Sequence, residues 1–295
     1  MDSYLGAIDL GGTKIISACF SPEGELLHEP VETPTGAGSS PEEIIDNICA
    51  NLDQSLARCG ISADRLSHLG LGVPTTVQYD KGLIDPSPNL PTMSDFPLGS
   101  RLSGKLSGVT VTMENDANCF ALGEATCGAA AGSSTCCGIT LGTGLGLGLV
   151  IEGKVYHGSH WCAGEIWKCA YGDGILEDKV RGASLARAYR HSTGNELTCE
   201  QVHLEARQGD QAALDVFLEM GRHLGRGLSY LVNILDPEVI IFGGSVSQAF
   251  DLFIEPLEQE ISRHRIKRNS TRFVKAKLGK LAPLYGAVFC ERKPG

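Results

Sequence analysis

The sequence predicts a mixed α/β fold made of two similar halves. Strand-like and helical patterns alternate from one end of the chain to the other, which is typical of α/β proteins. A pattern of strand, glycine-rich turn and strand occurs twice, starting at Gly6 and again at Gly138, and each copy then reaches a Glu-Gly turn, at residues 23–24 and 152–153. A chain of 295 residues can hold two domains of ordinary size. We therefore expect a duplicated α/β domain with its boundary near Met113.

Each expected element follows from a local pattern. Short runs of β-branched and apolar residues predict strands over residues 4–10, 15–20, 68–73, 109–113, 135–141, 145–151 and 239–242. Apolar residues at helical spacing predict helices over residues 41–59, 117–128, 182–191, 199–208, 211–234, 250–263 and 284–293. Ser40 and Pro41 suit the N-cap and first turn of the first helix. Residues 81–107 are rich in proline, glycine and serine, which indicates an irregular connection of the kind that carries a binding site.

Composition and charge exclude several classes of protein. A net charge of −10 argues against nucleic acid as the main partner. No apolar run approaches the roughly 18 to 20 residues that span a bilayer, and the first strand begins without a signal-peptide pattern before it. The eleven cysteines are odd in number and scattered among apolar or small residues, which favours reduced thiols over a disulfide framework. These features together predict a cytoplasmic protein.

The segment over residues 111–126 holds the candidate catalytic group. A β-prone run ends at Glu114 and Asn115, and a helix of small residues follows at once, so we expect Asp116 at the helix N-cap. A carboxylate at the end of a strand in an α/β sheet lies where such sheets bind ligands. There it can accept a proton from a bound hydroxyl group. The alternative is a plain N-cap without chemistry.

The first glycine turn has the residues that a phosphate requires. Gly11 and Gly12 let the backbone turn tightly and bring N–H groups close to a ligand. Thr13 adds a hydroxyl donor, Lys14 adds a positive charge, and Asp9 can hold Mg²⁺ through a water molecule. A second strand follows this turn, so the motif is neither a Walker A loop nor a dinucleotide fingerprint, both of which open a helix.

Two further glycine turns follow later strands. Gly142, Thr143 and Gly144 repeat the pattern of the first turn, and two facing turns would suit a phosphate chain held between two lobes. Gly243 and Gly244 end a buried strand, where a flat ring or a ribose could lie against bare backbone. Each of these turns could equally be an ordinary connection without a ligand.

Together, seven motifs in this order resemble the ROK family of sugar kinases and sugar-responsive regulators, within the actin-like ATPase superfamily. They are D-x-G-G-T-K at 9–14, G-x-G-V-P at 70–74, P-N-L-P at 88–91, E-N-D-A-N at 114–118, L-G-T-G-x-G at 141–146, A-G-E-I at 163–166 and I-I-F-G-G-S at 240–245. The resemblance implies two actin-like (ribonuclease H-like) domains with a cleft between them. One would be residues 1–113 joined by a last helix at about 281–295, and the other residues 114–280. It also implies ATP and Mg²⁺ as cofactors, a homodimer, and Asp116 as the base that activates the sugar 6-hydroxyl.

The resemblance also assigns the sugar-binding residues. Asn89 and Asn115 would hydrogen-bond sugar hydroxyls, and Glu165 would bind two more. Glu177 falls where the family has a glutamate that closes a cysteine-rich loop. Carboxylates and carboxamides suit sugars because they can form paired hydrogen bonds with neighbouring hydroxyls. Lys168 stands where many relatives have a histidine, and it could donate to the sugar in its place.

The family's zinc motif is altered in this chain. That histidine ligates zinc with three cysteines downstream in many relatives, whereas here the cysteine block is shortened and one cysteine survives. A protonated lysine is a poor zinc ligand, so we expect no structural zinc. His157, His160, Cys162 and Cys169 are of ligand type and could form a replacement site, but their spacing matches no recognisable zinc pattern.

The favoured function is an ATP-dependent hexokinase with glucose as acceptor. Thr75, Gln78 and Tyr79 depart from the family pattern near the sugar, so another hexose or an N-acetylhexosamine is an alternative, as is polyphosphate as donor. A non-catalytic sugar-sensing regulator would normally carry an amino-terminal helix-turn-helix, whereas a strand is expected from residue 4. A degenerate pseudokinase disagrees with the intact Asp9, Asp116 and glycine turns.

Overall fold

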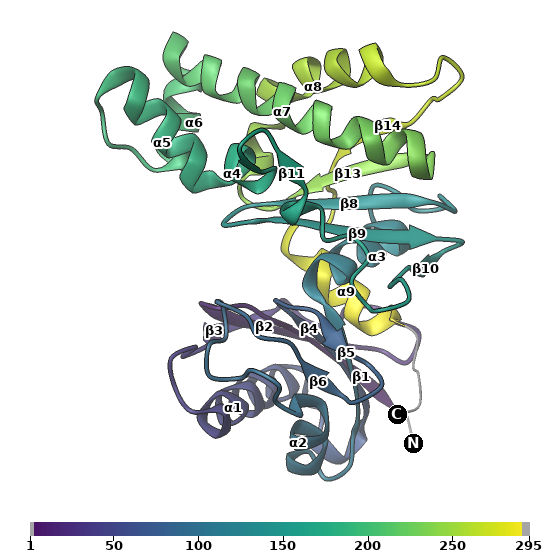
Figure 1. Ribbon diagram of the computed structural model, residues 1–295. Helices are drawn as coiled ribbons and strands as arrows, with labels where there is room; N and C mark the ends of the chain where they lie inside the picture. The colour runs from purple at the N-terminus through teal and green to yellow at the C-terminus, as the bar shows by residue number, and fades with distance from the viewer. Residues whose placement is uncertain (1–2, 291–295) are drawn as a thin grey trace.

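The computed structural model describes residues 3–290 and contains two five-stranded sheets, one below the other in Figure 1. The strands of the first sheet, in spatial order, are β3 (Val31–Pro34), β2 (Lys14–Phe20), β1 (Tyr4–Leu10), β4 (Leu66–Val73) and β7 (Thr110–Asn115). Those of the second are β10 (Lys154–Val155), β9 (Leu145–Ile151), β8 (Cys136–Leu141), β13 (Val239–Gly243) and β14 (Arg272–Lys275).

The two sheets have the same topology. In each sheet the first two neighbouring pairs are antiparallel and the last two are parallel. The hairpins β1–β2 and β8–β9 are the two strand–turn–strand units that the sequence repeat predicts. The mixed α/β fold of two related lobes is therefore confirmed.

Helices lie between the sheets and outside them (Figure 1). The helices α3 and α9 pack against each other between the sheets; α3 contacts β8 and β9 of the second sheet, and α9 contacts β1 and β4 of the first. The helices α1 and α2 cover the outer face of the first sheet, and α5 to α8 lie over the second. Their bounds are α1 Pro41–Cys59, α2 Leu98–Lys105, α3 Asp116–Cys127, α4 Glu177–Val180, α5 Gly182–Thr193, α6 Cys199–Arg207, α7 Gln211–Leu235, α8 Phe250–His264 and α9 Ala282–Phe289.

The contact between α3 and α9 depends on two glycines. A Cβ on Gly286 would lie 1.8 Å from the Cys119 carbonyl oxygen, and one on Gly123 would lie 2.0 Å from the Ala282 carbonyl oxygen. Because real side-chain atoms do not approach so closely, only glycine lets the two backbones meet here. This pair of helices connects the two lobes, and α3 begins at Asp116.

Most of the predicted elements are confirmed with shifts of one or two residues at their ends, and Ser40 caps α1 with Glu43 as a capping box. The irregular connection predicted over residues 81–107 was wrong in part, because it contains β6 and α2. The strands β3 and β14 were not predicted; each is a four-residue edge strand with few buried positions, so its alternation is weak. The last helix ends at Phe289, and the predicted part beyond residue 290 lies outside the described residues.

The remaining short strands form two small hairpins: β5 (Val77–Gln78) with β6 (Leu83–Ile84), and β11 (Ala170–Tyr171) with β12 (Gly174–Ile175). All eleven cysteines lie within the described residues and are thiols, as predicted. Over residues 3–290, no helix is both long and apolar enough to cross a membrane.

Candidate active site

Asp116 lies at the junction between β7 and α3. It is the first residue of α3, and the N-cap is Asn115, whose side-chain oxygen accepts from the backbone N–H groups of Ala117 at 3.0 Å and Asn118 at 3.2 Å. The N-cap predicted at Asp116 was therefore wrong by one residue, because Asn115 keeps the extended backbone of the strand (φ −62°, ψ 141°). Asn115 is thus the N-cap of α3, and the Asp116 carboxylate is not needed for capping.

The environment of Asp116 raises its pKa. Burial raises the pKa of Asp116 from 3.8 to about 7, the nearby charges of Asp9 and Glu165 add to the increase, and the Ala117 N–H opposes it. Burial also raises the pKa of Asp9 to about 6, which Lys14 partly offsets. A general base works best when its pKa is near the operating pH, so a value of about 7 suits proton abstraction. The carboxylates of Asp9 and Glu165 are thus close enough to Asp116 to influence its pKa.

The first glycine turn follows β1 and packs against the segment that carries Asn89. The Gly11 carbonyl accepts from the Thr35 hydroxyl at 2.7 Å, which fixes the turn. A Cβ on Gly12 would lie 2.9 Å from the Asn89 carbonyl oxygen, so glycine is required for this contact. The Asn89 residue itself is exposed. The turn and the predicted sugar-binding asparagine are therefore neighbours, although they are far apart in sequence.

The polar residues of this turn face solvent. Thr13 and Lys14 are both exposed, and the Lys14 ammonium group forms an ion pair with Glu32 at 3.0 Å. An ion pair between two exposed side chains contributes little to stability. Lys14 can therefore leave Glu32 for a phosphate at small cost.

The second and third glycine turns lie together at the end of the second sheet. The strands β8 and β13 are parallel neighbours, with Thr140 paired to Gly243, so the turns that follow them meet at the same edge. Gly244 has φ +84°, and a Cβ there would lie 2.2 Å from the Leu141 carbonyl oxygen. Thr143, at the tip of the other turn, is exposed. Bare backbone and a hydroxyl group are thus presented side by side, which suits a nucleotide.

Glu177 contacts the second glycine turn. Its carboxylate accepts from the Leu145 N–H at 2.9 Å and occupies the space that a Cβ on Gly144 would need, at 2.8 Å. Arg181 lies 3.8 Å from its other oxygen. Glu177 therefore stabilises the conformation of the second glycine turn. The sequence pattern did not indicate this role.

Glu165 and Lys168 are both linked to Trp167. The indole N–H of Trp167 donates to the Glu165 carboxylate, and the Lys168 ammonium group lies 5.6 Å from the centre of the indole ring. Glu165 and Trp167 are half-buried, whereas Lys168 is exposed. Trp167 therefore orients the glutamate that the resemblance assigns to the sugar.

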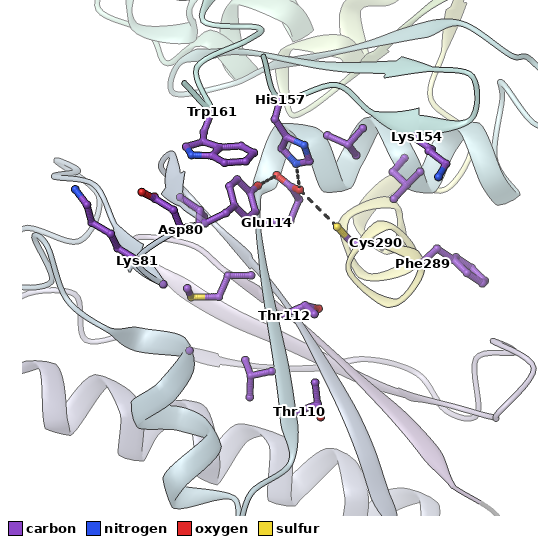
Figure 2. A pocket seen from close by; sticks show the side chains of 18 of the residues that line it. Asp80, Lys81, Thr110, Thr112, Glu114, Lys154, His157, Trp161, Phe289 and Cys290 are labelled. Atoms are coloured by element: carbon purple, nitrogen blue, oxygen red, sulfur yellow. Dashed lines mark hydrogen bonds and ion pairs between the residues drawn. The ribbon is translucent and has the colours of Figure 1, made fainter. Parts of the chain in front are cut away.

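A buried network around Glu114 was missed by sequence reasoning. Glu114 is 1% exposed and accepts hydrogen bonds from Tyr79 and, at 2.9 Å, from Asn118. His157 lies 2.6 Å from its other oxygen, and the His157 ring points toward Glu114 (Figure 2). Burial alone would raise the pKa of Glu114, but the hydrogen bonds and the charge of His157 hold it below its usual value. Sequence spacing offered no signal for a contact between residues 43 or 35 positions apart.

The ligand-type residues singled out in the sequence do not gather into a metal centre. His157 is held by Glu114, and the Cys162 thiol donates to the His160 carbonyl at 3.1 Å. Across the described residues, no group of three or more His, Cys, Asp or Glu side chains could hold a metal ion. The replacement site considered for His157, His160, Cys162 and Cys169 is therefore not assembled.

Two α/β lobes of one topology, with glycine turns at their strand ends and Asp116 at the start of the helix between them, define a fold of the actin-like class. The ROK family model matches residues 5–293, so the chain belongs to the ROK family. A glucokinase of Halalkalibacterium halodurans is 32% identical over 97% of this chain and 94% of that protein. An N-acetyl-D-glucosamine kinase of Vibrio cholerae is 30% identical over 98% of this chain and 100% of that protein. A ROK family glucokinase from Streptomyces griseus, solved in complex with glucose and AMPPNP, superposes with a TM-score of 0.82 at 28% identity, covering 97% of this chain and 98% of that one.

Proposed function

We propose that the protein transfers the γ-phosphoryl group of ATP to the 6-hydroxyl of a hexose, with glucose as the preferred acceptor and Asp116 as the general base. The observation that carries this proposal is the position of Asp116 at the start of α3, with a pKa of about 7. The similarity to a glucokinase with bound glucose and AMPPNP supports the same pair of substrates.

On the acceptor side, we assign the sugar to the region between Asn89 and Glu165. Asn89 is exposed beside the first glycine turn, and the Glu165 carboxylate is oriented by Trp167. Two acceptor oxygens on one carboxylate can bind two neighbouring sugar hydroxyls. Asn115, Lys168 and Glu177 keep the substrate-binding role that the resemblance assigns, but each has a competing contact. The Asn115 side chain caps α3 and donates to the Thr75 carbonyl, so its role in sugar binding is the weakest of these.

On the donor side, we assign the phosphates to the glycine turns at Gly11–Gly12 and Gly142–Gly144, and the nucleoside to Gly243–Gly244. Asp9 fits a magnesium ion held through water, because Mg²⁺ binds few protein carboxylates and retains water and phosphate oxygens. When bound with ATP, the ion neutralises phosphate charge during transfer. Asp9 is the penultimate residue of β1, two residues before Gly11 of the first turn, which suits such a role.

The chain's own residues then account for the reaction as follows. Glu165 and Asn89 hold the hexose so that its 6-hydroxyl approaches Asp116. Asp116 accepts the hydroxyl proton as the sugar oxygen attacks the γ-phosphorus of ATP, and the phosphoryl group passes to the sugar while ADP leaves. Backbone N–H groups of the turns, with Lys14, stabilise the charge on the phosphate oxygens. Approach of the two lobes excludes water, which would otherwise compete with the sugar.

An N-acetylhexosamine is the second candidate acceptor, since a named N-acetyl-D-glucosamine kinase is nearly as similar as the glucokinases. Trp167 favours the smaller acceptor in this proposal, because its bulky indole group lies directly beside Glu165.

A coupled ADP-release assay over a dozen hexoses and N-acetylhexosamines, with ATP and with polyphosphate as donors, tests the proposal. We expect the highest kcat/KM with glucose and ATP. If an N-acetylhexosamine gave the highest value, the acceptor assignment would be wrong and the kinase class would stand. No turnover with any acceptor would refute the proposed function.

A further inference from the structure

A cavity of about 1000 Å³ lies beside β7, between the first sheet and the loop that follows β10 (Figure 2). Its walls include Tyr79, Met113, Trp161 and Phe289, and Asp116 is not among its lining residues. Drug-sized ligands are held in cavities of roughly 300 to 1000 Å³ with mostly apolar walls and a few polar groups. The cavity therefore has the size and lining of a small-molecule site separate from the assigned substrate region.

One wall of the cavity is aromatic. The Tyr79 and Trp161 rings lie 5.0 Å apart, and His157 lies against both rings at 4.7 and 5.9 Å. Trp161 has φ +61°, a left-handed backbone conformation that is rare for bulky residues and costs about 1 to 3 kcal/mol. Such strain persists where the surrounding structure fixes it, and ligand clamps are among the places where it is found. The strained backbone places an indole group on the cavity wall.

The floor of the cavity offers hydrogen-bonding groups. Five consecutive residues of β7, from Thr110 to Glu114, line it, and within residues 3–290 the only strand paired with β7 is β4. The edge of a sheet that no strand covers presents backbone N–H and C=O groups. The lining also includes two acidic residues and two lysines, whose formal charges cancel: Asp80, Lys81, Glu152 and Lys154. The occupant that matches aromatic walls, edge hydrogen bonds and cancelling charges is a flat, uncharged heteroaromatic molecule.

We propose that this cavity is a second ligand site, for an uncharged planar heteroaromatic molecule whose binding increases the affinity for the sugar. The physical link is the contact of His157 with Glu114. Glu114 lies two residues before Asp116, and His157 opens the segment that reaches Glu165 eight residues later. A ligand packed on Trp161 and His157 would hold this segment in place, so less ordering would remain to be done when the sugar binds. This link rests on the proposed function, whereas the binding site itself does not.

Titration with prodan tests the site: this uncharged naphthalene dye, which fluoresces strongly in apolar surroundings, stands in for the proposed ligand through its flat aromatic ring and its carbonyl hydrogen-bond acceptor. Thr110→Phe should fill the cavity from an exposed position of β7 and weaken dye binding by about fivefold or more. Trp161→Gly removes the indole ring while suiting the positive φ, and it should weaken binding by a similar factor. Ser270→Phe is the matched control, since Ser270 is exposed and does not line the cavity, and its dye affinity should stay within about twofold of wild type.

Dye binding that is equal in wild type, Thr110→Phe and Trp161→Gly would overturn the site. With saturating dye, the hexose KM should fall by about threefold or more in wild type and remain unchanged in Thr110→Phe. Dye binding at the cavity without any change in KM would overturn the regulatory half of the proposal. If no hexose were turned over at all, the proposed function would fail, and the dye titration would still decide whether the cavity binds a ligand.

Discussion

Replacing Asp116 with asparagine should stabilise the protein at neutral and alkaline pH, although Asp116 is the proposed base. The pKa of Asp116 is 3.8 in its ordinary state and about 7 in the folded protein. Well below pH 3.8 the carboxyl group is protonated in both folded and unfolded chains, so it does not affect the free energy of unfolding. As the pH rises toward 7, the unfolded chain ionises first, so the free energy of unfolding falls. Above pH 7 the loss is complete.

The size of the effect follows from the two pKa values. A difference of about three pKa units corresponds to about 4 kcal/mol, which is the most that the charged carboxylate can cost the folded state. Asparagine has nearly the same shape and does not ionise, so Asp116→Asn removes this cost. We expect the stabilisation to grow by about 2 to 3 kcal/mol between pH 5 and pH 8.

Urea unfolding of wild type and variant, followed by circular dichroism at pH 5, 6.5 and 8, measures this difference. Asn115→Ala is the informative control, because Asn115 is the true N-cap, and its loss should cost about 0.5 to 2 kcal/mol with little dependence on pH. Equal stability of Asp116→Asn and wild type at all three pH values would refute the reasoning. The pKa of Asp116 would then not be raised in the folded protein.

Three further predictions concern other parts of the molecule. Elemental analysis of chelator-washed protein should find well under one zinc per chain with activity retained, since Lys168 replaces a histidine ligand; stoichiometric zinc needed for activity would contradict this. Glu114→Gln weakens the contact with His157, so it should lower the free energy of unfolding by about 1 to 3 kcal/mol. It should also raise the hexose KM more than the ATP KM. Equal changes in both KM values would argue against a link between Glu114 and the sugar site. Tyr230 and Ile234 are 69% and 85% exposed on α7, as expected of residues that form a homodimer contact. Ile234→Glu should then convert the dimer to a monomer in analytical ultracentrifugation. A dimer that is unchanged in this variant would place the contact elsewhere.

The sequence could predict the fold because its main signals are local. Helix and strand periods, the two glycine hairpins and the cap of α1 at Ser40 each depend on neighbouring residues. Edge strands such as β3 bury too few positions to show alternation, and α2 begins inside a segment dominated by proline and glycine. The cap at Asn115 was missed because asparagine and aspartate are about equally good N-caps, and only the backbone angles distinguish them.

The candidate site was predictable as a set of residues but not as a set of contacts. Motif order placed Asp9, Asp116 and Glu165 in one site, and the charges of Asp9 and Glu165 raise the pKa of Asp116, which agrees with that placement. The contacts of Trp167 with Glu165 and of Glu177 with the second glycine turn depend on three-dimensional packing. Sequence patterns carry no signal for such packing, nor for a cavity, because both are formed by residues from separate elements.

The most direct test of the proposed mechanism is the kcat of Asp116→Asn with the acceptor chosen by the hexose screen. Sugar binding should be retained, as measured by a change in tryptophan emission from Trp167 beside Glu165 in a Trp161→Phe background. Loss of the proton acceptor should lower kcat by about 10² to 10⁴. A variant that binds the sugar and keeps more than about a tenth of the wild-type kcat would show that Asp116 is not the base.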